Sequence, residues 1–159
     1  MLENSSPSYR EKLLPLYSYT KQKSSKYKEY LTTLFGELDN EKIIKILAFS
    51  QIKKLEDGDF LFTQGQMDTS FYIVLRGRLR VIYTDKVGRR KNLGDVTSGE
   101  PVGEFAIYTR EPRTASVVAI RQTEVLEINE QNYFEIISSF PSLATSLTKF
   151  IIKRMQGNA

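Results

Sequence analysis

Hydrophobic residues recur at helical spacing near both ends of the chain. Apolar positions three or four apart over residues 26–36 predict one helix, and a second follows Asp39 or Asn40, either of which can cap it. The buried face of that second helix is predicted to hold Ile43, Ile44 and Leu47. Near the carboxyl end, Asn129 is a further candidate cap, and helical spacing continues past Pro141, which ends one helix or begins the next.

The middle of the chain has a different pattern. Seven of the nine glycines lie between residues 58 and 103, and they are most simply turn residues. Leu79, Val81 and Tyr83 alternate with mostly polar positions, which is typical of a strand with one solvated face. The predicted strand segments are Phe60–Thr63, Phe71–Leu75, Leu79–Tyr83, Ser116–Ile120 and Val125–Ile128. About eight short strands at this spacing favour a mainly β sandwich or barrel with flanking helices over a parallel sheet.

Composition and charge exclude several classes of protein. The 159 residues include no cysteine and no histidine. This absence argues against thiolate chemistry, most hydrolases and metal-dependent cupin enzymes. We therefore expect no catalytic and no metal-binding residues. Residues 1–30 hold six Lys/Arg and three Asp/Glu, whereas the other 129 residues are nearly balanced, which is weak support for nucleic-acid binding. No apolar run is long enough to span a bilayer. We therefore expect a cytoplasmic protein.

Residues 103–116, reading GEFAIYTREPRTAS, combine several groups that suit a sugar phosphate. Gly103 permits an unusual backbone angle and close approach of a ligand. The next residues can form one helical turn with free N–H groups, and Arg113 offers a planar fork for two phosphate oxygens. An ionised Glu104 is a pure acceptor that suits sugar hydroxyls. We expect Arg110 and Glu111 to be solvated loop charges.

This segment resembles the phosphate-binding cassette of the cyclic nucleotide-binding domain family. Seven spaced positions match without an insertion: Gly103, Glu104, Ala106, Pro112, Arg113, Ala115 and Ser116. The resemblance extends over roughly residues 30–155, and FTQGQMDTSFYIVLRGRLRVI is similar to a strand–loop–strand unit of the family. It implies an antiparallel, eight-stranded, jelly-roll-like β-roll over about residues 49–128 and two C-terminal helices over about 129–156. Residues 26–159 would form this domain, after a basic Tyr/Ser-rich extension or tail at residues 1–25.

The resemblance also implies roles for individual residues. Arg113 would bind the cyclic phosphate, Glu104 the ribose 2′-hydroxyl, and Thr114 the phosphate or a guanine amino group. Backbone N–H groups near Phe105, Ala106 and Ala115 would complete the phosphate site, next to Gly103. Apolar lid candidates on the last helix are Phe150, Ile151 and Met155. The expected ligand is cyclic AMP, with cyclic GMP open because Thr114 permits both, and no other cofactor is expected.

Two main functions remain open at this level. The first is a regulatory sensor module in which a cyclic nucleotide moves the C-terminal helices, with an effector protein or a missing downstream domain as its unknown partner. The second is an interaction domain of the same fold without a nucleotide ligand. An enzyme is disfavoured because no base or second clustered carboxylate accompanies Glu104. The apolar last helix permits a homodimer.

Overall fold

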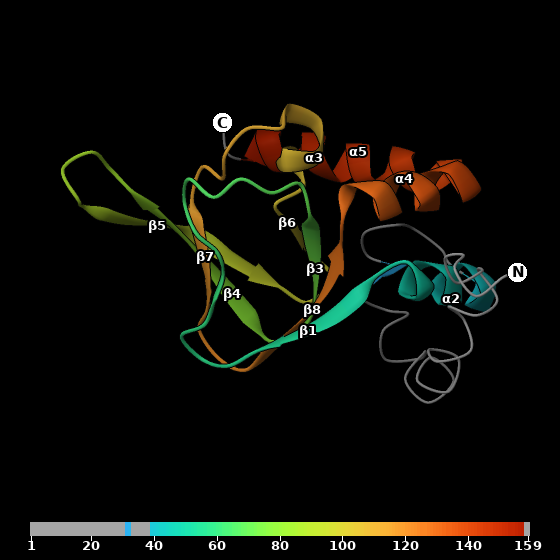
Figure 1. Cartoon of the computed structure of the whole chain (residues 1–159), viewed down its shortest axis with the longest axis horizontal. Helices are drawn as coiled ribbons and strands as arrows, with labels where there is room; N and C mark the ends of the chain where they lie inside the picture. Colours follow the sequence, from blue (N-terminus) through green and yellow to red (C-terminus); the bar gives the residue numbers. More distant parts are fainter. Residues whose placement is uncertain (1–30, 33–38, 158–159) are drawn as a thin grey trace, which may run out of the picture.

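The computed structural model of the chain describes residues 31–32 and 39–157. Eight strands in this part form two antiparallel four-stranded sheets. The predicted mainly β fold with eight antiparallel strands is confirmed. One sheet has the order β1-β8-β3-β6 and the other β2-β7-β4-β5 (Figure 1). The strands are β1 (Gln51–Leu55), β2 (Phe60–Phe62), β3 (Phe71–Arg76), β4 (Arg78–Thr84), β5 (Arg90–Thr97), β6 (Pro101–Val102), β7 (Ser116–Ala119) and β8 (Thr123–Ile128). Three of these, β1, β5 and β6, were not among the predicted strand segments.

Strand β3 is buried on both faces, which explains its uninterrupted run of apolar residues. Tyr72 and Val74 pack between the two sheets, together with residues from β4, β7 and β8. Phe71, Ile73 and Leu75 point the other way and pack against the helices. The β3 strand therefore separates the inter-sheet core from a second core under the helices.

The helices lie beside the β3 side of the roll (Figure 1). They are α2 (Asn40–Ala48), α3 (Phe105–Thr109), α4 (Glu130–Ser139) and α5 (Pro141–Gly157). Asp39 is the cap of α2, accepting a hydrogen bond of 2.9 Å from the Lys42 amide, and Asn129 caps α4 in the same way. Of the expected buried face, Ile43 and Leu47 are buried and Ile44 is half-buried, while Ile46 joins them in the core.

Several sequence predictions fall on residues that the structure does not describe. The basic extension at residues 1–25 and most of the helix expected over 26–36 lie outside the described residues, although Leu31 is described and fully buried. Pro141 begins α5, and Leu143 and Leu147 bury one side of that helix. The side chains of the lid candidates Phe150, Ile151 and Met155, farther along α5, also lie outside the described part.

Strands β4 and β5 form a long hairpin whose turn extends away from the rest of the roll (Figure 1). The pairing shifts register between Val81 and Ile82, because Val81 faces Gly94 whereas Ile82 faces Asn92. Leu93 is therefore the extra residue of a β-bulge, and Gly94 adopts a φ of 132° there. The bulge lies midway along the hairpin, beside the cavity that the next section describes.

Candidate functional site

The chain between β6 and β7 wraps around a cavity of about 560 Å³, a size typical of small-ligand sites. This stretch contains Gly103, Glu104, the short helix α3 and the loop that leads to Arg113. All seven residues predicted to contact a ligand line this one cavity: Gly103, Glu104, Phe105, Ala106, Arg113, Thr114 and Ala115. The fold thus brings the expected residues together, while their roles in binding stay predictions.

Arg113 is the buried cation of the site, with a side chain only 3% exposed. Its Nε donates to Asp68 Oδ2 at 3.3 Å, and its Nη1 donates to the Gly103 carbonyl oxygen at 2.9 Å. Its Nη2 donates to Asp68 Oδ1 and to the Ser70 carbonyl oxygen. The guanidinium carbon also lies 4.0 Å from the centroid of the Phe62 ring. The buried charge is therefore paired and held on several sides.

These contacts make the Arg113 guanidinium less available to two phosphate oxygens than the sequence suggested. A guanidinium carries five N–H donors, and four of them already have partners within the protein. The edge made by Nε and Nη2 faces Asp68, a residue of the β2–β3 loop that sequence analysis did not single out. Asp68 lies within the stretch quoted for the family resemblance, but nothing in that stretch shows that the fold brings this loop to the cassette.

Gly103 is required by its conformation and by its neighbours. Its φ is 79°, in the region that favours glycine. A Cβ atom at this position would lie 2.6 Å from Nη1 of Arg113 and 3.2 Å from a ring carbon of Phe62. Any side chain here would displace the guanidinium, so Gly103 and Arg113 form one structural unit.

Glu104 is the second buried charged residue of the cavity, with 1% of its surface exposed. It precedes α3 but its side chain does not cap that helix. In the expected phosphate site, the Ala106 amide already donates to the Gly103 carbonyl at 3.3 Å. Arg113 and Glu104 therefore supply the cavity with a cation and a carboxylate that are both shielded from water.

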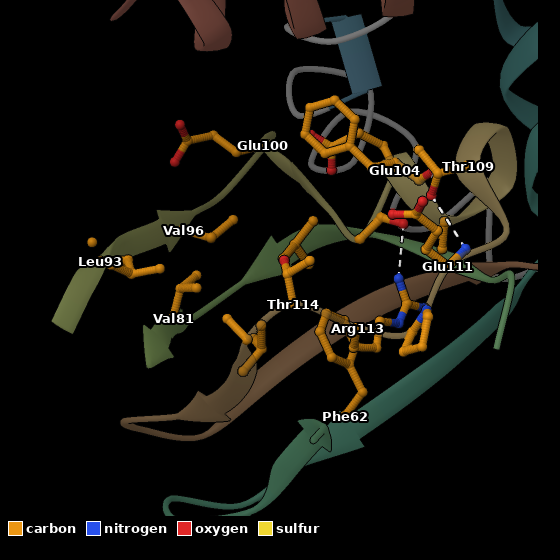
Figure 2. Close-up of a pocket in the computed structure, with 18 of the residues that line it drawn as sticks. Phe62, Val81, Leu93, Val96, Glu100, Glu104, Thr109, Glu111, Arg113 and Thr114 are labelled. Carbon is orange, nitrogen blue, oxygen red and sulfur yellow. Dashed lines mark hydrogen bonds between the residues drawn. The ribbon is translucent and has the colours of Figure 1, made fainter. Parts of the chain in front are cut away.

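The opposite wall of the cavity is apolar and was missed by the sequence analysis. Figure 2 shows Val81, Leu93 and Val96 gathered on one side, with Arg113 and Phe62 on the other. The bulge at Gly94 adds Leu93 to this wall, because it places this extra residue, 52% exposed, beside the cavity. An isolated glycine within a strand pattern is the sequence signal that could have indicated it. An apolar wall facing a paired cation suits a ligand with a planar base and a charged group.

Two further groups near the cavity have shifted pKa values. Hydrogen bonds from Arg80 and then Arg78 lower the pKa of Asp95 on β5 to about 2, so this carboxylate is ionised and paired. Burial, followed by the nearby charges of Glu127 and Asp68, raises the pKa of Tyr72 to about 12. Both groups therefore keep their ordinary charge near neutral pH, and neither is poised to exchange a proton there.

Helix α3 is joined to α4 by two polar contacts. The hydroxyls of Tyr108 and Tyr133 are 2.5 Å apart, and their rings meet edge to face. Arg110, in the left-handed conformation at the end of α3, forms an ion pair with Glu130 in the first turn of α4. The Arg110 side chain is 67% exposed, as expected of a solvated charge, but the sequence did not predict its ion pair with Glu130. The cassette and the C-terminal helices are thus in direct contact.

Within the part of the chain that the structure describes, no cluster of three or more acidic side chains could hold a metal ion. Likewise, none of the described helices is long and apolar enough to cross a membrane.

Comparisons with known proteins agree with this geometry. The family profile described as "Cyclic nucleotide-binding domain" matches residues 52–140. The "Cyclic AMP receptor protein" of Thermus thermophilus is 28% identical over 123 residues, which cover 77% of this chain and 57% of that protein. Human "Patatin-like phospholipase domain-containing protein 6" is 32% identical over 104 residues, 65% of this chain but only 8% of that protein. The crystal structure of Thermus thermophilus catabolite activator protein superposes with a TM-score of 0.74 at 28% identity, over 79% of this chain and 59% of that chain.

Proposed function

The chain belongs to the cyclic nucleotide-binding domain family, and we propose that it is a sensor module that binds cyclic AMP in the cavity beside Arg113. The observation that carries this proposal is the gathering of all seven expected contact residues around one cavity of about 560 Å³. Its buried cation, buried carboxylate and apolar wall match the phosphate, ribose hydroxyl and base of such a ligand.

Arg113 would hold the cyclic phosphate in this proposal. One Nη1 hydrogen has no partner described within the protein, and the positive charge adds attraction at short range. A second bond to the phosphate requires Arg113 to exchange a bond with Asp68 or with a carbonyl oxygen for one with the ligand. Glu104 would accept from the ribose 2′-hydroxyl. The base would lie on Val81, Leu93 and Val96, where burial of apolar surface favours any purine.

Ligand binding in the cavity would be transmitted to the C-terminal helices through α3. A ligand that orders the cassette changes the position of α3, and α3 is tied to α4 by the Tyr108–Tyr133 and Arg110–Glu130 contacts. Ligand binding shifts the helices only to the extent that these contacts differ between the bound and free states. The proposed output is therefore a movement of α4 and α5 that an effector protein or an adjoining domain detects.

Calorimetric titration with cyclic AMP, cyclic GMP and linear 5′-AMP tests the ligand. We expect cyclic AMP to bind most tightly and 5′-AMP least tightly, because the linear phosphate carries more charge and a different shape. Tighter binding of cyclic GMP would reassign the ligand and point to Thr114, which is exposed in the cavity. Binding of none of the three would refute the sensor proposal.

The variant Arg113→Lys tests the role of the guanidinium. Lysine keeps the charge but loses the planar fork, so affinity for the cyclic nucleotide should fall by about 1.5–3 kcal/mol. Arg121→Lys, in an exposed turn outside the cavity, is the matched control and should bind as the original chain does. Equal affinity of the two variants would contradict the proposed site.

The second candidate, an interaction domain without a nucleotide ligand, is favoured by the Asp68–Arg113 pair. This pair already neutralises the cation that the phosphate would otherwise neutralise. Thermal denaturation separates the two functions, since a true ligand at about 100 times its dissociation constant stabilises the fold by about 2.7 kcal/mol. No shift with either cyclic nucleotide would favour the interaction domain.

The output and the partners of the domain are also proposals. The chain spans 57% of the Thermus receptor protein and 8% of the human phospholipase-domain protein, so those proteins contain regions without a counterpart here. We propose a regulatory role without catalysis by this domain, in the cytoplasm, with an effector protein or an adjoining domain as the partner. A homodimer through the last helix stays a prediction that the sedimentation rate of the purified chain can test.

A further inference from the structure

The tip of the β4–β5 hairpin is strongly basic and lies away from the nucleotide cavity. Figure 1 shows the hairpin extending past the rest of the described chain. Residues 39–157 contain 17 Lys/Arg and 15 Asp/Glu. Residues 84–91 alone contain four of these Lys/Arg and one of these Asp/Glu. None of residues 84–91 lines the cavity. The net positive charge of the described body is therefore concentrated at this tip.

Asp85 makes several hydrogen bonds across the turn. Its backbone amide donates to the Arg89 carbonyl oxygen at 2.9 Å, and its Oδ1 accepts from the amides of Val87 at 3.0 Å and Arg89 at 2.8 Å. Asp85 Oδ2 pairs with Arg89 Nε at 2.8 Å. Lys86, Arg90 and Lys91 are exposed and pair with no carboxylate among the described residues, so the tip presents three uncompensated cations.

Val87 lies at the apex, between Lys86 and the turn glycine Gly88. It is 73% exposed, more than any other large apolar side chain that the structure describes. The bond from its amide to Asp85 fixes its backbone within the turn. The tip therefore combines an apolar apex with flanking cations on a convex, hydrogen-bonded turn.

We propose that this tip, defined by Lys86, Val87, Arg90 and Lys91, docks on the surface of an anionic lipid membrane. Cations near such a surface are attracted by its negative potential, and an exposed apolar side chain between them can enter the boundary between headgroups and acyl chains. A convex turn offers no groove for an acidic peptide. Nucleic-acid phosphates are contacted by polar and charged groups, so the apolar apex would not contribute to binding a nucleic acid. Docking would place the sensor at the membrane surface, and it does not depend on nucleotide binding.

Vesicle cosedimentation of the full chain tests the charge component. The chain should pellet with phosphatidylserine–phosphatidylcholine vesicles at low salt and not with phosphatidylcholine alone. The triple variant Lys86→Gln, Arg90→Gln, Lys91→Gln should lose at least ~10-fold in binding. The matched triple Lys53→Gln, Lys54→Gln, Arg121→Gln removes the same charge from other exposed positions and should bind like the original chain. Equal losses in the two triples, or no binding by the original chain, would overturn the proposal.

A tryptophan probe tests the apex directly and leaves the cations in place. The chain contains no tryptophan, so Val87→Trp introduces a single indole. Its emission should shift to shorter wavelength on anionic vesicles, whereas Phe60→Trp, at another exposed position, should not shift. An unshifted Val87→Trp spectrum, or tighter binding to duplex DNA or to polyglutamate than to the vesicles, would show that the tip serves another partner or none.

Discussion

Asp68 and Arg113 form an ion pair across 45 positions of sequence, in which the Asp68 carboxylate, 23% exposed, accepts from both Nε and Nη2 of the buried guanidinium. Asp68 lies in the loop between β2 and β3, whereas Arg113 belongs to the cassette between α3 and β7. The Gln66 carbonyl oxygen accepts from the Arg113 amide at 2.9 Å, which joins the same two loops through the backbone. The pair thus fixes the wall of the cavity where the proposed ligand phosphate would lie.

We expect Asp68→Asn to destabilise the domain in the absence of ligand. Asparagine keeps one acceptor but removes the negative charge, which leaves the 3%-exposed Arg113 side chain incompletely compensated. The free energy of unfolding should fall by about 2 kcal/mol, as measured by urea denaturation. Asp57→Asn, at an exposed position before β2, is the control and should change stability little. A loss of the same size in both variants would mean that the pair contributes nothing specific.

Gly103→Ala and Gly58→Ala separate backbone strain from crowding. Both glycines have positive φ, 79° and 93°, so alanine should cost about 1 kcal/mol of stability at either position. Only at position 103 would the added Cβ meet neighbours, because the space beside Gly58 is open to 4 Å. Gly103→Ala should therefore lose more stability than Gly58→Ala and also weaken cyclic nucleotide binding. Denaturation and calorimetry of the two variants side by side check this, and identical behaviour would contradict it.

Tyr108→Phe should weaken the connection between the cassette and α4. It removes the hydroxyl contact with Tyr133 while keeping the edge-to-face rings, so we expect a stability loss of about 1 kcal/mol. Hydrogen exchange in α4 should then respond less to cyclic nucleotide than in the original chain. Tyr83→Phe, at an exposed position near the end of β4, provides the control. If α4 responds to the nucleotide equally in both variants, the signal does not pass through this contact.

Asp95 should make part of the stability of the domain dependent on acid pH. Because its folded-state pKa of about 2 lies below the ordinary value, ionised Asp95 stabilises the fold above about pH 4, and this contribution is lost as the pH falls toward 2. The arginine partners are 42% and 39% exposed, so solvent screening limits the contribution to about 1 kcal/mol. Asp95→Asn should lower stability at pH 7 and have a flatter acid dependence. If the free energy of unfolding of Asp95→Asn depends on pH in this range as steeply as that of the original chain, this assignment is contradicted.

The cassette could be recognised from sequence because its residues are close together along the chain. Gly103, Glu104 and Arg113 lie within one short stretch, and the fold only had to close a loop to bring them around one cavity. The apolar wall is different, because Leu93 faces the cavity as the extra residue of a bulge. A one-residue shift in a strand changes which side chains point to which face, and a hydrophobic pattern by itself leaves that register open.

The sequence by itself determined the succession of helices, short strands and helices, the mainly β class, the cap Asn129 and the residues of the cassette, but not the strands β1, β5 and β6 or the choice between Asp39 and Asn40 as the first cap. Each feature that it determined depends on local rules, since a cap, a strand period or a turn glycine is fixed by a few neighbouring residues. Only the tertiary structure decided that Asp68 pairs with Arg113, that α3 contacts α4 through Tyr108 and Arg110, and that a basic hairpin tip stands apart from the body. Local rules do not fix these relationships, because they depend on how the two sheets and the helices pack on the two faces of β3.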